Sequence, residues 1–202
     1  MVQPLTRDRV VDAALAIVES DGVPALSMRA LSEKLGVAVT AIYWHVGNKD
    51  AVLDALVERM SAEIGGIRTT GRTPHQRITS TARSLLAALE AHGALAGIAH
   101  QRGSLAIVFA PARRAIAEEF AAAGLRGARL ADATNAVVQI VASYALTEAV
   151  LSRSPEQPRT DVRLWDGPPT IDAVAVRRLE AQPDTPRAFA VALDALVRGL
   201  CP

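Results

Sequence analysis

The sequence predicts an all-α fold, and three observations carry that prediction. Half of the 202 residues are hydrophobic but only 3% are aromatic, so a core must be built from Ala, Leu, Val and Ile. Apolar residues recur at spacings of three and four, as on one face of a helix, and the alternation typical of strands is scarce. Gly and Pro separate these periodic segments, where helices are expected to end.

Composition limits the class of protein. A chain of this length can bury a sizeable core as one domain of ordinary size or as two small ones. No apolar run reaches the roughly 18 residues of a membrane span, and the N-terminus has no signal-peptide pattern. The single cysteine, Cys201, excludes an intramolecular disulfide and a cysteine-based metal site. We therefore expect a soluble cytoplasmic protein without membrane contact.

The first 48 residues predict a small three-helix unit. Thr6 is suited to cap a helix that reaches about Ser20, and Asp21-Gly22 ends that helix. From Ser27 to Lys49, two short apolar repeats flank Gly36, a residue that adopts the positive φ of a helix end without strain. Two short helices joined in this way form a helix-turn-helix, whose second helix enters the major groove of DNA.

A longer helix is expected to connect this unit to the rest of the chain. It begins at Lys49 and reaches about residues 65–66, with an apolar face of Val52, Leu53, Leu56, Val57 and Met60. Residues 65–74 hold three glycines, three threonines and a proline, and are predicted to be the linker and domain boundary. The predicted organisation is therefore a helix-turn-helix domain (1–48), a connecting helix (49–66) and a C-terminal regulatory and dimerisation domain (67–202).

About six further helices are expected in the C-terminal domain. The predicted segments are 75–91, 94–101, 103–123, a longest helix over 128–153, a short one at 171–181, and 187–200. Pro111 either kinks the third of these or marks its true start. The longest helix is apolar on more than one side, which is typical of a helix that packs against two partners.

The segment that follows the turn carries the most specific signal. AIYWHVGNKDAVLDAL, residues 41–56, resembles the end of the recognition helix and the start of the next helix in the tetracycline-repressor (TetR) family. Tyr43-Trp44-His45-Val46, followed by Asn48-Lys49, is similar to the branch of the tetracycline repressors themselves, whereas most of the family has Phe in place of Val46. The resemblance implies DNA contacts from Arg29, Thr40, Ala41, Tyr43, Trp44, His45 and Lys49.

Alternative roles remain open at these positions. Trp44 and His45 are suited either to contact phosphate or to pack inside the head, and Arg29 and Lys49 are also compatible with solvated charges. Val39 and Ala41 stand where relatives in this branch have more polar residues, so the tetracycline operator sequence is not carried over. Residues 1–60 hold eight acidic and six basic side chains, which opposes phosphate attraction. We therefore expect weak non-specific binding and a dimer for tight binding.

For the C-terminal domain the resemblance rests on pattern alone. It implies a homodimer through the helices at 128–153 and 187–200, and a cavity for a small apolar or amphipathic effector among the helices between 75 and 153. Trp165 either closes that cavity or pins its loop. The candidate ligand contacts are His100, Gln101, Phe109, Gln139, Ser143, Tyr144 and Thr147.

A tetracycline–magnesium site is not expected. Tetracycline repressors hold the drug chelate through two histidines, an Asn and a Phe, and the first three matching positions fall here near Ile64 and Gly65, Ala82 and Leu86. His100 alone matches, which is a poor metal site. We expect no metal, no cofactor and no enzyme activity, since no catalytic motif has recognisable spacing.

The predicted function is a transcriptional repressor that a small molecule releases from a palindromic operator. The alternative is a DNA-binding regulator without an inducer, which is constitutive, controlled by a partner or an activator.

Overall fold

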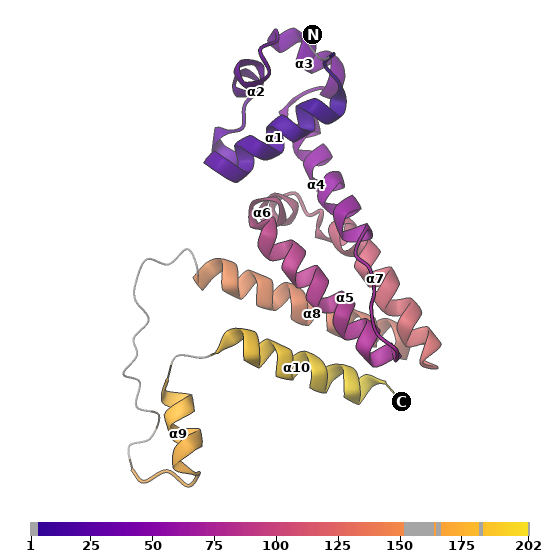
Figure 1. The fold of residues 1–202 in the computed structure, drawn as a ribbon, viewed down its shortest axis with the longest axis vertical. Helices are drawn as coiled ribbons and strands as arrows, with labels where there is room; N and C mark the ends of the chain where they lie inside the picture. The colour runs from indigo at the N-terminus through magenta and orange to yellow at the C-terminus, as the bar shows by residue number, and fades with distance from the viewer. Residues whose placement is uncertain (1–3, 152–163, 165–166, 182–183, 202) are drawn as a thin grey trace.

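The computed structural model describes residues 4–151, 164, 167–181 and 184–201. Within these residues every regular element is helical, as the sequence predicted. Figure 1 shows a small head of α1 (Arg7–Asp21), α2 (Met28–Leu35) and α3 (Val39–Val46) at one end of the molecule. α4 (Lys49–Gly65) runs from this head into a larger helical core.

The core contains five further helices: α5 (Pro74–Ala91), α6 (Gly93–Gln101), α7 (Leu105–Ala122), α8 (Gly127–Leu151) and α10 (Thr185–Leu200). α9 (Ala173–Glu180) buries no residue and stands apart from them in Figure 1. α7 contacts α4, α5 and α8, and therefore lies at the centre of the core. α10 packs on α5 and α8, and α6 lies on the side of the core that faces the head (Figure 1). None of the described helices is long and apolar enough to cross a membrane.

The predicted helix starts are fixed by side-chain caps. The Thr6 hydroxyl accepts from the Arg9 N–H, and the Ser27 hydroxyl accepts from the Ala30 N–H. Asn48 caps α4 by accepting from the Ala51 N–H at 2.9 Å. Each cap satisfies a backbone donor that the first turn of a helix leaves unpaired. A 3-10 turn over Val23–Ala25 links α1 to α2 and was not predicted.

α4 ties the head to the core because its apolar face is buried along most of its length. Its buried side chains belong to one hydrophobic cluster that includes residues of both the head and the core: Val52, Ala55, Leu56, Val57, Met60 and Ile64. α4 contacts α1 at the head and α6 and α7 in the core. The connecting helix is therefore packed into the hydrophobic interior of the head and into that of the core.

Pro111 lies inside α7, which begins at Leu105, so the alternative that Pro111 marks the start of this helix was wrong. A proline has no N–H, and the carbonyl four residues earlier, that of Ile107, therefore loses its helical donor. The Ser61 hydroxyl of α4 donates to this carbonyl at 3.0 Å. The proline thus creates an acceptor that a neighbouring helix uses, and α7 continues past it.

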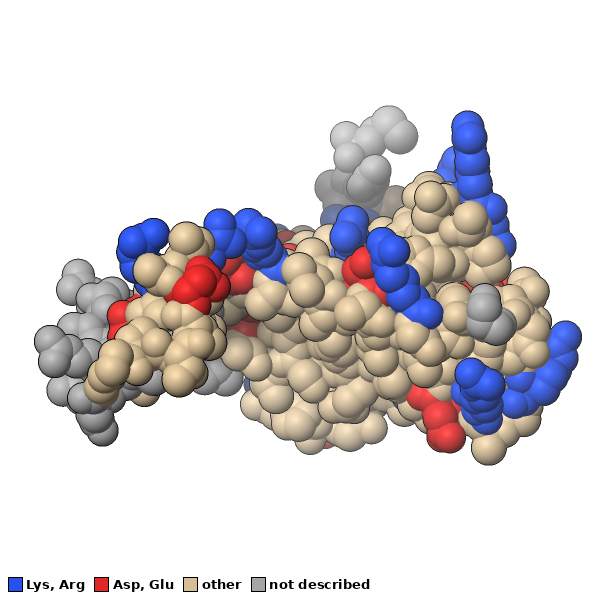
Figure 2. Space-filling model, turned by 90° about the horizontal axis from the view of Figure 1, so that it is seen from below, with Lys and Arg blue, Asp and Glu red and all other residues tan. Residues whose placement is uncertain are grey.

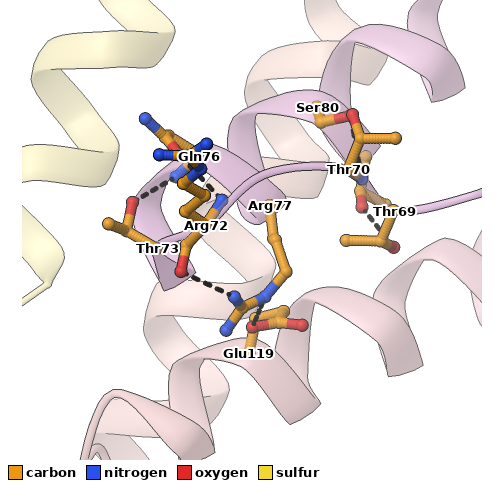
Figure 3. A network of polar contacts seen from close by, with 9 residues as sticks. Thr69, Thr70, Arg72, Thr73, Gln76, Arg77, Ser80 and Glu119 are labelled. Atoms are coloured by element: carbon orange, nitrogen blue, oxygen red, sulfur yellow. Dashed lines mark hydrogen bonds and ion pairs between the residues drawn. The ribbon is translucent and has the colours of Figure 1, made fainter.

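The loop between α4 and α5 is held against the core by hydroxyl and amide groups (Figure 3). Thr69 and Thr81 share a hydrogen bond of 2.9 Å, and Thr70 and Ser80 share one of 2.8 Å. The Gln76 side chain accepts from the Arg72 N–H at 2.8 Å. The Thr and Gly content that predicted a linker therefore forms a fixed connection along α5, and the domain boundary at residue 66 remains a prediction.

An ion pair joins two core helices just beneath this loop. Arg77 of α5 donates from Nε to Glu119 of α7 at 2.7 Å, and its Nη1 donates to the Arg72 carbonyl at 3.2 Å (Figure 3). Both charged side chains of the pair are mostly buried. The pair fixes α5 against α7 and leaves neither charge unpaired, which burial would otherwise penalise.

The Ser61–Ile107 contact predicts a coupling between α4 and α7 that urea denaturation can measure. Ser61→Ala should lower the free energy of unfolding by about 0.5–1.5 kcal/mol, because the Ile107 carbonyl loses its donor. Pro111→Ala restores an N–H within α7, so Ser61→Ala should cost clearly less in that background. Equal costs in the two backgrounds would show that the hydroxyl does not replace the missing helical donor.

Candidate nucleic-acid interface

The turn between α2 and α3 has the geometry of a helix-turn-helix. Gly36 ends α2 in the left-handed region, with φ 66° and ψ 34°, which glycine adopts without a steric penalty. The Ser32 hydroxyl donates to the Val37 carbonyl at 2.6 Å, and the Ser32 carbonyl accepts from the N–H groups of Gly36 and Val37. Ser32 thus fixes the angle between the two helices.

α3 presents one face to the interior of the head and the opposite face to solvent. Ile42 is fully buried, and Val39 and Val46 are half-buried on the same side. The predicted contact residues of α3 lie on the other side, where Ala41 is half-buried and the rest are exposed: Thr40, Ala41, Tyr43, Trp44 and His45. α3 has no side-chain cap at its N-terminus, so its first N–H groups remain available to a phosphate.

Trp44 is the most exposed large side chain of this face, at 91%, and Tyr43 is 49% exposed. The alternative that Trp44 packs inside the head is therefore wrong, because Ile42 already fills the interior position of this turn. His45 is likewise exposed. Two aromatic side chains held in water at the end of a short helix are poised to contact sugar, phosphate or the methyl groups of bases.

Arg29 and Lys49 flank α3 from the neighbouring helices. Arg29, in the first turn of α2, is exposed and donates from Nε to Glu33 at 2.9 Å. Lys49 is the first residue of α4 and is exposed. The interface therefore combines an aromatic and hydroxyl surface on α3 with a basic side chain from each adjacent helix.

Most acidic side chains of the head are paired with basic ones. Six of the eight acidic side chains in residues 1–60 have a basic partner within 4 Å: Asp12, Glu19, Glu33, Asp50, Asp54 and Glu58. Glu19 meets His92 of the core, and Asp50 and Asp54 meet Arg102. Half of these paired carboxylates therefore face the core, so the acidic excess of residues 1–60 overstates the repulsion that DNA would meet.

The candidate ligand residues lie in several places. His100 and Gln101 end α6 and are exposed, whereas Phe109 is buried in α7. On α8, Tyr144 is half-buried and its ring lies 4.6 Å from that of Phe189 of α10. The others share the exposed face of α8, where Ser143 accepts from both neighbours: Gln139, Ser143 and Thr147.

These seven residues are therefore not gathered around one space in the described part of the protomer, and their ligand-binding role remains a prediction. Trp165 lies outside the described residues, as does the predicted end of α8 at residue 153. An open groove of about 630 Å³ is found elsewhere, between α9 and α10. The described residues contain no cluster of three or more His, Cys, Asp or Glu that could hold a metal ion.

Sequence reasoning missed two residues that shape this end of the molecule. Ser32 stands four positions before Gly36, a signal that a hydroxyl near a helix end can bond the turn that follows. Arg102 had no local signal, because its partners Asp50 and Asp54 lie about fifty positions earlier in the chain.

Comparison with known proteins supports a family assignment. Residues 10–56 match the family model described as bacterial regulatory proteins, tetR family. Over 58 residues the chain is 45% identical to the class D tetracycline repressor protein of Escherichia coli, a match that covers 29% of this chain and 27% of that protein. The match thus spans about a quarter of the length of this relative.

Two solved structures share the fold over nearly the whole chain. The Streptomyces coelicolor TetR family protein ActR, solved in complex with actinorhodin, has a TM-score of 0.72 and 25% identity, with coverage of 98% of this chain and 97% of that one. BioQ, solved with its double-stranded DNA operator, has a TM-score of 0.66 and 23% identity, with coverage of 98% and 99%. Residues 10–56 thus resemble the N-terminal domain of tetR family regulators, and the whole chain shares the fold of solved TetR family structures.

Proposed function

We propose that this protein is a homodimeric transcriptional repressor that binds a palindromic operator through α3 and is released by a small molecule. The single observation that carries the proposal is the exposed face of α3, with Tyr43 and Trp44 held in solvent beside Lys49. A monomer has too small a recognition surface for tight binding. Two heads contact half-sites about 34–36 Å apart, or a multiple of that distance, and gain affinity through effective concentration.

The exposed apolar surface of α8 and α10 supports the dimer. One side of α10 is buried through Phe189, Leu193 and Val197. The opposite side lines the groove and is also mostly apolar: Ala188, Val191, Ala192 and Ala195. Leu146 of α8 is exposed as well. Figure 2 views the molecule from the end opposite the head, where few charged side chains cross the middle of the surface. Such a surface is suited to a second copy of the chain.

A small apolar or amphipathic effector is the proposed inducer. The structure of ActR with actinorhodin, which shares this fold at 25% identity, supports a ligand in this class of core. Of the candidate residues, Phe109 and Tyr144 point toward the interior of the protomer and are the strongest. An effector releases DNA only if it binds more tightly to the conformation whose heads are wrongly placed.

The second candidate is a regulator without an inducer, and the exposed positions of His100, Gln101 and the α8 hydroxyls favour it. Thermal melting against apolar metabolites and antibiotics separates the two, because a ligand of the native state raises the midpoint by mass action. A compound that raises the midpoint and releases operator in a gel shift supports induction. Tight operator binding with that compound bound rules out induction.

Regulators of the TetR family are not enzymes, and we place this protein in the cytoplasm.

The proposal as a whole is tested by selection of bound fragments from random duplex DNA. The expected product is a palindrome with half-sites one or more helical turns apart. Recovery of no enriched sequence by a protein that ultracentrifugation shows to be a monomer would overturn it.

Tyr43→Ala should weaken binding to the selected operator at least about tenfold, roughly the loss of one good contact in each half-site. Gel-shift titration at fixed salt measures the change. Glu90→Gln on α5, an exposed side chain outside the helix-turn-helix, is the matched control and should leave the affinity within about twofold. Unchanged affinity in Tyr43→Ala would remove Tyr43 from the interface.

Val191→Glu should shift the protein toward monomer, because a charge placed in an apolar interface must be desolvated without a partner. Sedimentation over a range of concentrations measures the shift. Ile107→Glu on α7 is the control, since its side chain is 56% exposed against 63% for Val191 and lies on another helix. A dimer that survives Val191→Glu unchanged would place the interface away from this face of α10.

A further inference from the structure

Side chains at the two ends of α6 contact α4, the helix that carries the head, and one of them also approaches α1. Arg102 follows the last residue of α6 and contacts the first two turns of α4. Its Nη1 donates to Asp50 at 3.0 Å, and its Nε donates to Asp54 at 2.8 Å. At the other end, His92 Nε2 lies 3.0 Å from a Glu63 carboxylate oxygen of α4, and its Nδ1 lies 3.5 Å from Glu19 of α1.

We propose that these contacts set the position of the DNA-binding head on the core, with Arg102 as the positioning residue. The inference rests on the proposed function, because head position matters only if two heads read two half-sites. It concerns the resting position of the head in the DNA-binding dimer, and is independent of the identity of any effector.

The composition of α6 explains why charged groups have this role. The helix is built largely of small residues, GALAGIAHQ, and its buried side chains are Leu95, Ile98 and Ala99. Burial of smooth apolar surface stabilises contact without fixing direction. A guanidinium that donates to two carboxylates fixes both distance and direction. Arg102 therefore restrains sliding and rotation of α4 that the apolar contacts of α6 would permit.

Arg102 is well placed for this role. Asp50 and Asp54 are one helical turn apart, so one guanidinium reaches both, and Asp50 follows directly after Lys49 at the recognition surface. The hydrogen bonds to Asp50 and then Asp54 raise the pKa of the Arg102 guanidinium, a group that is charged at every ordinary pH. Both carboxylates are exposed, so the pair adds little to stability. Loss of these contacts should therefore change the position of α4 more than the free energy of unfolding.

Operator spacing reports head position directly. One added base pair moves the second half-site by about 3.4 Å and rotates it by about 35°. The selected operator and versions lengthened or shortened by one base pair are compared by gel-shift titration with the full-length protein. Wild-type protein should discriminate strongly against the altered spacings.

Arg102→Gln should lower affinity for the native spacing about three- to tenfold and reduce the discrimination against altered spacings by at least about tenfold. Asp54→Asn should act in the same direction, and the double variant should lose little beyond Arg102→Gln, since both remove one contact. Arg102→Lys keeps the charge but loses the planar guanidinium that donates to two carboxylates. Its discrimination between spacings should therefore lie between those of wild type and Arg102→Gln.

Arg77→Gln is the matched control. Arg77 is 27% exposed against 25% for Arg102 and also donates from Nε to a carboxylate, but it joins α5 to α7 within the core. It should lower the melting temperature without altering the spacing profile. The inference is overturned if Arg77→Gln loses as much discrimination between spacings as Arg102→Gln, or if Arg102→Gln loses none. In either case, operator binding by the wild-type protein would still support the proposed function. Failure of wild type to bind any operator overturns both.

Discussion

The shared burial of α4 is the constraint on which the rest of this structure depends. Its apolar face belongs to the hydrophobic cluster that runs from the head into the core. Polar contacts then fix it at both ends: Asp50 and Asp54 meet Arg102 near its start, and Ser61 bonds the α7 carbonyl that Pro111 leaves free. A three-helix head of this size buries too little surface to be stable alone. The helix that stabilises the head is therefore also the helix that positions it.

The same arrangement resolves the charge of the head. An excess of acidic side chains in a DNA-binding domain opposes binding, since attraction to phosphate supplies much of the non-specific affinity. In the folded chain, the carboxylates of Glu19, Asp50 and Asp54 are directed at the core. They attach the head while Arg29 and Lys49 stay on the side of α3. Charge is thus divided by face: these three carboxylates face the core, and the two basic side chains flank α3.

Recognition and attachment consequently use different chemistry. α3 offers aromatic rings and a hydroxyl on a helix anchored only by Ile42 and its half-buried neighbours. Such a short helix holds its orientation because Ser32 and Gly36 fix the turn before it and Asn48 caps the helix after it. Rigid presentation lowers the entropy lost on binding. The core, in contrast, leaves an apolar side of α10 uncovered, which supports the proposed homodimer.

The sequence by itself determined the helices and located the helix-turn-helix. Periodicity located the helices to within a few residues, and caps such as Thr6 and Ser27 marked their starts. The local motif around Tyr43 identified the recognition helix. All of these signals act between residues that are at most a few helical turns apart. Only the tertiary structure decided that Trp44 faces solvent, that Pro111 stays within a helix because Ser61 serves its free carbonyl, and that Arg102 holds α4. Each of these three features depends on a partner some fifty residues away in the sequence, or on which side of a helix packs against its neighbours. No local pattern encodes that information, because it arises when the helices pack.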